Sequence, residues 1–205
     1  MINDLLENIQ QMGVGVQAFA DDVVVYATIS KQESLSQHLE APLREIYEWG
    51  ARWMVTFAAD KTKAMHFSRL RGSVVGELRF GEEKLQIATQ YKYLGITFDR
   101  KLNWKQHLQY ITGRARDNVV KINAVSRRQW GLGAIATKFM YQRAILPIMT
   151  YGAIVWGSAI TIKKNLTLFQ KTQRLAAIGI TSCPTTTPTE AMEVLAGLLP
   201  IDQVL

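Results

Sequence analysis

Apolar residues follow two different periods along the chain, and the period changes near residue 100. Before that point, Val14–Phe19 alternates loosely and Val23–Tyr26 is a β-branched and aromatic run, which is typical of paired strands. Asp21 and Asp22 lie between these two runs, and aspartate is a common turn residue. The pattern therefore predicts a β-hairpin with two carboxylates at its tip.

Helical spacing and short apolar runs predict the other elements of this first part. Apolar residues at helical spacing up to Trp53 predict a helix of roughly twenty residues, with Pro42 as a candidate kink. All five tryptophans are expected to be core anchors, because large indole rings are usually buried. They are Trp49, Trp53, Trp104, Trp130 and Trp156. Four further strands are predicted at Ala64–Ser68, Glu77–Phe80, Lys84–Ile87 and Tyr91–Phe98.

Beyond residue 102 the apolar residues recur with the period of an α-helix. Trp104, Ile111 and Val119 mark one face of a long helix, and further helices are expected after it. These later helices are predicted at Phe139–Leu146, which ends at Pro147, and at Leu166–Ile178.

Length and composition fit a folded chain with one domain or two small ones. The chain has 205 residues, of which 48% are hydrophobic and 20% are charged, as in globular proteins. We assign it to the α+β class, with mixed strands and helices in residues 1–100 and an all-helical region in residues 101–205.

Two expectations concern cysteine and the membrane. The single cysteine, Cys183, cannot form an intrachain disulfide, and no cysteine partners support zinc binding by the isolated His38, His66 and His107. A reducing compartment is therefore expected. We expect no signal peptide and no membrane span, because the longest nearly uncharged stretch, Ala144–Ile162, is interrupted by proline and glycine.

Charge is distributed unevenly along the chain. Residues 1–60 hold 3 bases and 9 acids (net −6), residues 61–138 hold 16 and 5 (net +11), and residues 139–205 hold 5 and 3 (net +2), which accounts for the overall +7. An acidic segment followed by a basic one suits a protein that gathers cations at one place and follows a phosphate backbone at another. A solvated basic surface is the alternative explanation.

The Asp21–Asp22 pair is the first candidate for chemistry. Two neighbouring carboxylates repel each other in water, yet at a tight turn they can hold Mg²⁺, a hard cation that prefers oxygen ligands. Paired metal ions can stabilise both the attacking and the leaving oxygen of an in-line displacement. Ordinary turn chemistry also explains two aspartates between strands.

Four segments, in this order, carry a resemblance to a known family. The segment Phe19–Asp22 resembles the metal-binding palm hairpin of reverse transcriptases, in which an aromatic residue precedes Ala-Asp-Asp. The later segments are similar to the family's lysine-containing segment, its primer-grip strand and its thumb. They are Trp53–Lys63, Tyr91–Asp99 with Trp104, and Tyr151–Gly152 with Trp156. The likeness covers nearly the whole chain, and it is strongest to non-LTR (LINE-type) retrotransposons of the jockey-like and ribosomal-DNA-inserting arthropod classes.

The resemblance implies an RNA-directed DNA polymerase that uses Mg²⁺ or Mn²⁺, an RNA template, a DNA primer and deoxynucleoside triphosphates. It implies a palm in residues 1–100, a thumb in residues 101–205, and target-primed synthesis in the nucleus at the site of integration. Asp21 and Asp22 then act as catalytic metal ligands, and Lys61 as a cation beside the triphosphate. The residues expected to touch the primer are Tyr93, Leu94 and Gly95.

Each of these roles has a structural alternative. Lys61 can be a solvated turn lysine, Tyr93–Gly95 can belong to an ordinary core strand, and bases on an exposed helix face can simply be solvated. If the basic residues instead contact the phosphates of a template–primer duplex, they form a stripe along the long helix. Its members are Lys105, Arg114, Arg116, Lys121, Arg127 and Arg128.

The sequence departs from the family pattern in one respect. A reverse transcriptase needs another metal-binding aspartate on an earlier palm strand, together with fingers, and neither is found here. Met1–Ile9 already resembles the helix before the metal hairpin, so Asp4 and Glu7 are not expected to replace that ligand. We therefore expect part of a longer polymerase that is inactive alone. The alternative is a non-catalytic nucleic-acid-binding relic of such an element.

Overall fold

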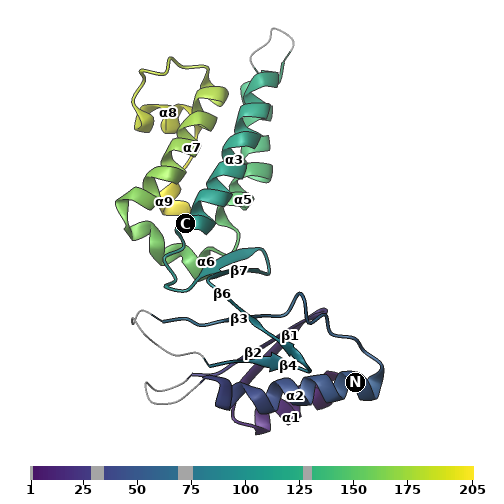
Figure 1. Cartoon of the computed structure of the whole chain (residues 1–205). Coiled ribbons are helices and arrows are strands. Elements are labelled where there is room, and N and C mark those ends of the chain that lie inside the picture. The colour runs from purple at the N-terminus through teal and green to yellow at the C-terminus, as the bar shows by residue number, and fades with distance from the viewer. Residues whose placement is uncertain (1, 29–34, 69–75, 127–130) are drawn as a thin grey trace. The chain divides into compact units, whose positions relative to one another are not determined.

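The computed structural model divides the chain into two compact units, Met1–Tyr91 and Lys92–Leu205. Both contain helices and short strands, which confirms the α+β class (Figure 1). The division lies within strand β7 (Gln90–Tyr93), ahead of the one expected near residue 100. The structure describes residues 2–28, 35–68, 76–126 and 131–205.

The first unit combines two helices with three strand pairs. Strands β1 and β2 form an antiparallel hairpin, β4 and β5 form a second one, and β3 pairs with β6 in parallel. The elements are α1 (Ile2–Gln11), β1 (Gly15–Phe19), β2 (Asp22–Tyr26), α2 (Leu35–Trp53), β3 (Lys63–Met65), β4 (Arg79–Phe80), β5 (Glu83–Lys84) and β6 (Gln86–Ala88).

An apolar cluster joins the helices of the first unit to its strands. Leu5 and Ile9, four residues apart on α1, are fully buried against β1 and α2. Trp49 of α2 is also buried, and its indole Nε1 donates a hydrogen bond to Asp4 Oδ2 at 3.2 Å. Trp53, at the last position of α2, remains 44% exposed, so its assignment as a core anchor is wrong. Trp49, one turn earlier on α2, is the indole that packs into this core.

The second unit is a hairpin followed by helices. Strand β8 (Ile96–Asp99) pairs with β7, so the single strand predicted over Tyr91–Phe98 is wrong. The chain reverses at Leu94 and Gly95, both of which have positive φ (44° and 82°). The helices are α3 (Lys105–Ser126), α4 (Ala134–Met140), η1 (Tyr141–Ile145), α5 (Leu146–Thr150), α6 (Ala153–Trp156), η2 (Gly157–Thr161), α7 (Lys163–Thr181), α8 (Thr189–Ala196) and α9 (Ile201–Val204).

Helices α3 and α7 pack against each other in the second core. The predicted face of α3 is buried, including Trp104 just before the helix, Ile111 and Val119. Trp156 is fully buried and stacks on Phe169 of α7, with ring centroids 5.6 Å apart. These contacts confirm Trp104 and Trp156 as core anchors. Trp130 lies outside the described residues.

The sequence predicted that a helix ends at Pro147, but in the structure the helical chain continues through this residue. The π-helical segment η1 continues directly into α5, in which Pro147 occupies one of the first two positions. A proline has no N–H, and its ring clashes with the carbonyl four residues earlier in a regular α-helix. The wider π turn lets the chain continue through this proline.

Within the described residues, no single helix is long and apolar enough to cross a membrane. The segments Ala134–Thr150 and Ala153–Thr161, bent by 46° relative to each other, reach the required length and composition only together. Cys183 is half-buried and packs against the second core, as a small packing residue would.

A polar side chain between α3 and α7 requires a glycine opposite it. Asn123 is buried, and its Nδ2 donates a hydrogen bond to the Leu175 carbonyl at 2.9 Å. Its Oδ1, which has no hydrogen-bond partner in the described part of the chain, lies against Gly179. A Cβ at position 179 would overlap the Asn123 carboxamide. The close approach of the two helices therefore depends on Gly179.

We predict that Gly179→Ala lowers the free energy of unfolding by about 1 to 3 kcal/mol, the usual cost of overpacking a core. Urea denaturation monitored by circular dichroism measures the change. Gly113→Ala on α3 is the matched control, because a Cβ there has nothing within 4 Å. It should raise stability by about 0.5 to 1 kcal/mol, as alanine does in a helix interior. An unchanged stability in Gly179→Ala would contradict the proposed close approach.

Candidate functional site

The β1–β2 hairpin presents the two aspartates at its tip. Phe19 pairs with Asp22, so the chain reverses within Ala20 and Asp21. Ala20 has a φ of 53°, which is uncommon for a residue with a side chain and costs about 1 kcal/mol or more. The tight turn fixes the register of the hairpin and therefore the position of both carboxylates. The predicted hairpin and its tip are confirmed.

The two faces of this hairpin have different environments. Val16 and Val25 are paired, and both pack against the first core. Asp22 lies on the opposite face, because successive side chains of a strand alternate. Both aspartates are exposed, and Phe19 beside them is 62% exposed. One face thus anchors the hairpin while its tip offers carboxylate oxygens to solvent.

A second hairpin in the same unit repeats this layout. In β4–β5, Phe80 pairs with Glu83, and Gly81 and Glu82 form the two-residue turn. Gly81 has a φ of 59°, close to that of Ala20. Each tip therefore has a phenylalanine, a residue with positive φ and two adjacent acids.

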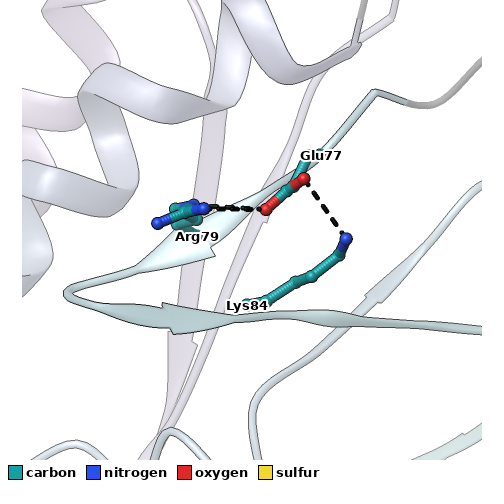
Figure 2. A network of polar contacts seen from close by, with 3 residues as sticks. All are labelled: Glu77, Arg79 and Lys84. Atoms are coloured by element: carbon teal, nitrogen blue, oxygen red, sulfur yellow. Dashed lines mark hydrogen bonds and ion pairs between the residues drawn. The ribbon is translucent and has the colours of Figure 1, made fainter.

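The two hairpins differ in the charges that accompany the acids. Glu77 is paired with Arg79 at 3.1 Å and with Lys84 at 3.2 Å, and both bases belong to the second hairpin (Figure 2). These bases lower the pKa of Glu77, chiefly through the hydrogen bond from Lys84. Residues 12–28, by contrast, contain Asp21 and Asp22 and neither lysine nor arginine. The β1–β2 hairpin therefore carries two acids and no lysine or arginine.

Carboxylate oxygens without a neighbouring base suit a divalent cation. Asp21 and Asp22 supply such oxygens, which Mg²⁺ and Mn²⁺ prefer, and their turn holds them on a packed hairpin. In the described part of the chain, no group of three or more histidine, cysteine or acidic side chains is placed to hold a metal ion. Among the described residues, the hairpin tip thus offers two carboxylate side chains that could serve as metal ligands.

Lys61 lies in the exposed turn after α2. Its backbone N–H donates to the Ala58 carbonyl at 3.1 Å, and its side chain is solvated. Among the described residues, no ion pair joins Lys61 to Asp21 or Asp22. The structure therefore places this lysine in the same unit as the aspartates without bringing them into contact.

The turn between β7 and β8 is tied to the helices of the second unit. The Tyr151 hydroxyl donates a hydrogen bond to the Leu94 carbonyl at 3.0 Å. A Cβ at Gly95 would lie 3.1 Å from the Tyr151 ring, so the ring covers the glycine. Leu94 and Gly95 are exposed, whereas Tyr93 is half-buried. The segment predicted to touch the primer is thus a fixed, exposed turn.

Buried rings continue this connection into the core. Trp156 Nε1 donates to the Tyr151 carbonyl at 2.9 Å, and His107 lies 5.8 Å from the Trp156 ring. The His107 Nδ1 accepts a hydrogen bond from the Thr97 N–H at 3.2 Å. Burial, followed by the Lys92 charge, lowers the pKa of His107. A neutral imidazole therefore supports strand β8 from inside the fold.

Asp99 orders the connection between β8 and α3. Its carboxylate accepts hydrogen bonds from the backbone N–H groups of Lys101, Asn103 and Trp104 at 2.8 to 3.1 Å. Leu102 and Trp104 both have positive φ within this loop. The acid therefore fixes where α3 begins, a role that the sequence pattern did not reveal.

The basic residues of α3 occupy two sides of the helix. Arg114 and Lys121, seven positions apart, lie near each other around the axis, as do Lys105 and Arg116. Arg114 and Arg116 point in directions about 200° apart, because each residue turns the helix by about 100°. All four are exposed, but they do not form one stripe. Arg127 and Arg128 lie outside the described residues.

Comparison with known proteins identifies the first unit. Residues 1–98 match the family model of reverse transcriptase (RNA-dependent DNA polymerase), and this range includes the β1–β2 hairpin and Lys61. Over these residues the chain is similar to reverse transcriptases. No solved structure matches the chain.

The relatives extend the likeness across both units. A Pol polyprotein of the type-1 retrotransposable element R1 from Bradysia coprophila is 30% identical over 98% of this chain and 20% of its own length. A related R1 polyprotein from Nasonia vitripennis is 25% identical over 98% of the chain and 50% of its own. The RNA-directed DNA polymerase from mobile element jockey of Drosophila melanogaster is 27% identical over 74% of the chain and 16% of its own. The chain thus spans between about a sixth and a half of these relatives, and the predicted likeness to non-LTR retrotransposon polymerases is confirmed.

We predict that Mn²⁺ binds this chain at Asp21 and Asp22, and weakly, since the described residues supply two ligands. Paramagnetic broadening in ¹⁵N spectra should be centred on these residues. The Glu82–Glu83 tip is an internal control, because its hairpin has the same layout but also carries Arg79 and Lys84, which pair with Glu77. Broadening centred on Glu82 and Glu83 instead would rule out the proposed metal turn.

Proposed function

We propose that this chain supplies the catalytic hairpin, the primer-contact turn and the thumb of a retrotransposon RNA-directed DNA polymerase. One observation carries the proposal: Asp21 in the two-residue turn and Asp22 directly after it stand on a hairpin with an anchored face, inside the segment that matches reverse transcriptases. The substrates are then an RNA template, a DNA primer and deoxynucleoside triphosphates. Synthesis takes place in the nucleus, at the site of integration.

In this function the two carboxylates hold Mg²⁺ or Mn²⁺ at the tip of the hairpin. The bound metal supplies charge stabilisation for the attacking and leaving oxygens of nucleotidyl transfer. The packed face of the hairpin, with Val16 and Val25, keeps the ligands in place during the reaction. A further carboxylate must come from outside the pair, because two-metal sites need more ligands than these two side chains provide.

Other residues bind and orient the nucleic acid and the triphosphate. Lys61 places an exposed cation in solvent, where it can neutralise the triphosphate charge. The Leu94–Gly95 turn offers exposed backbone for close contact with the primer, and Tyr151 holds that turn. We assign residues 1–100 to the palm and residues 101–205 to the thumb.

The number of ligands also supports a second candidate function. Only two acids gather at the hairpin tip within the described residues, which agrees equally with a nucleic-acid-binding relic. Such a protein would keep its basic surface and have no polymerase activity. Primer extension separates the two possibilities.

We predict that a chimaera of the Bradysia R1 polyprotein, in which this chain replaces the aligned segment, extends a DNA primer on RNA in the presence of Mg²⁺. Asp21→Asn should slow extension by about 100-fold or more, equivalent to about 2.7 kcal/mol in the barrier. Radiolabelled primer extension on a gel measures the rate.

Glu82→Gln is the matched control, since it removes one acid from the other hairpin tip, and it should leave the rate within about twofold of the parent. The 205-residue chain alone should extend no primer. An Asp21→Asn chimaera as fast as its parent would contradict the catalytic role of the hairpin.

A further inference from the structure

Two basic side chains from different elements converge on one tyrosine in the second unit. The Lys92 ammonium of β7 lies 5.2 Å from the centroid of the Tyr110 ring, and the Arg114 guanidinium lies 5.8 Å from it. Tyr110 and Arg114 are four residues apart on α3, so they share one side of the helix. Lys92 reaches the same ring from 18 positions earlier in the chain. We call Lys92, Tyr110 and Arg114 the basic triad.

The basic triad is exposed to solvent. Tyr110 is 44% exposed, and Lys92 and Arg114 are exposed as well. Both cations also influence the phenol: the hydrogen bond from Arg114, followed by the Lys92 charge, lowers the pKa of Tyr110. Both cations thus lie over the same exposed ring. Lys92 is also two residues before the turn at Leu94 and Gly95.

No carboxylate in the described part of the chain pairs with either cation. The nearest acid on the same side of α3, Asp117, is three residues beyond Arg114 and forms no ion pair with it. Two like charges held close together repel each other, so an anion that bridges them is favoured. The aromatic ring contributes by holding both cations in place before an anion arrives.

The ring itself is less suited to stacking on a base. Lys92 and Arg114 already lie over the Tyr110 ring. Proteins that bind single strands stack bases on aromatic faces that are open. Lysine and arginine side chains are the usual ligands of backbone phosphates, and such contacts carry no sequence information. The chemistry therefore favours a phosphodiester over a base.

We propose that the basic triad is a phosphate-binding site that holds the backbone of the polymerase's nucleic acid beside the primer-contact turn. The inference rests on the proposed function, because that function supplies the nucleic acid. It adds Lys92 and Tyr110 as binding residues and separates Arg114 from Arg116 on the other side of α3. Lys92 and Arg114 each neutralise phosphate charge, and Tyr110 positions them.

The test measures binding of the full chain to a short RNA–DNA hybrid of mixed sequence, by fluorescence anisotropy at several salt concentrations. Lys92→Ala and Arg114→Ala should each reduce the slope of log affinity against log salt by about 0.7 to 0.9, one phosphate contact. The corresponding loss of affinity is about five- to eightfold at 0.1 M salt. Lys171→Ala, which removes an exposed base from α7 of the same unit, is the matched control and should keep the wild-type slope.

Tyr110 variants test positioning separately from charge. Tyr110→Leu removes the ring and no formal positive charge, so affinity should fall about two- to threefold while the salt slope stays constant. Tyr110→Phe keeps the ring and should restore most of the affinity. A phenylalanine variant as weak as the leucine variant would overturn the positioning role.

Spectra of the Tyr110 ring distinguish the source of the phosphate. The hybrid should shift the ring resonances and raise the pKa of Tyr110 towards its ordinary value, because phosphates neutralise both cations. Inorganic phosphate at an equal concentration of phosphate groups should have no such effect. A response to inorganic phosphate without a response to the hybrid would overturn the assignment to nucleic acid.

The binding measurements contain EDTA and no triphosphate, so the metal hairpin does not contribute to them. Unchanged salt slopes in folded Lys92→Ala and Arg114→Ala variants would overturn the basic triad, and so would an equal loss in Lys171→Ala. Loss of primer extension in Asp21→Asn is measured independently. Failure of the proposed site and failure of the proposed function therefore give different results.

Discussion

Chain reversal within two residues is the constraint on which both candidate sites depend. A two-residue hairpin turn requires positive φ, which the structure provides at Ala20, Gly81, Leu94 and Gly95. Two of these positions carry a side chain, and each costs about 1 kcal/mol or more in backbone strain. Packing must offset this cost: the first core holds the β1–β2 hairpin, and Tyr151 holds the β7–β8 turn. These two positions lie next to the proposed metal ligands and within the turn proposed to contact the primer.

The chemistry of the two units follows from how each turn is supported. In the first unit, an apolar face fixes the hairpin, and acids without a neighbouring base stand at its tip. In the second, Asp99 and buried rings fix the strands that lead into α3, and Lys92 of β7 meets Tyr110 and Arg114 there. One unit thus offers negative charge to a cation, and the other offers positive charge to an anion. This agrees with the uneven distribution of charge along the sequence.

Local signals explain which features could be predicted from the sequence. The β1–β2 hairpin was predictable because a loosely alternating apolar stretch, two turn-forming aspartates and a β-branched run follow one another within the 13 residues from Val14 to Tyr26. The long helix α3 was predictable because apolar residues recur along it at helical spacing, and these residues form its buried face. The β7–β8 turn was missed because Leu94, which has positive φ, is not a turn-forming residue type. The basic triad was missed because Lys92 is remote in sequence from Tyr110, although the spacing of Tyr110 and Arg114 was a partial signal.

The most direct test of the central claim is anomalous diffraction from crystals of the R1 chimaera with a template–primer and an unreactive triphosphate, soaked in Mn²⁺. The claim that Asp21 and Asp22 are metal ligands predicts an anomalous peak within about 2.5 Å of oxygens from both carboxylates, close to the triphosphate. A peak bound by other acids, with both Asp21 and Asp22 unliganded, would contradict it.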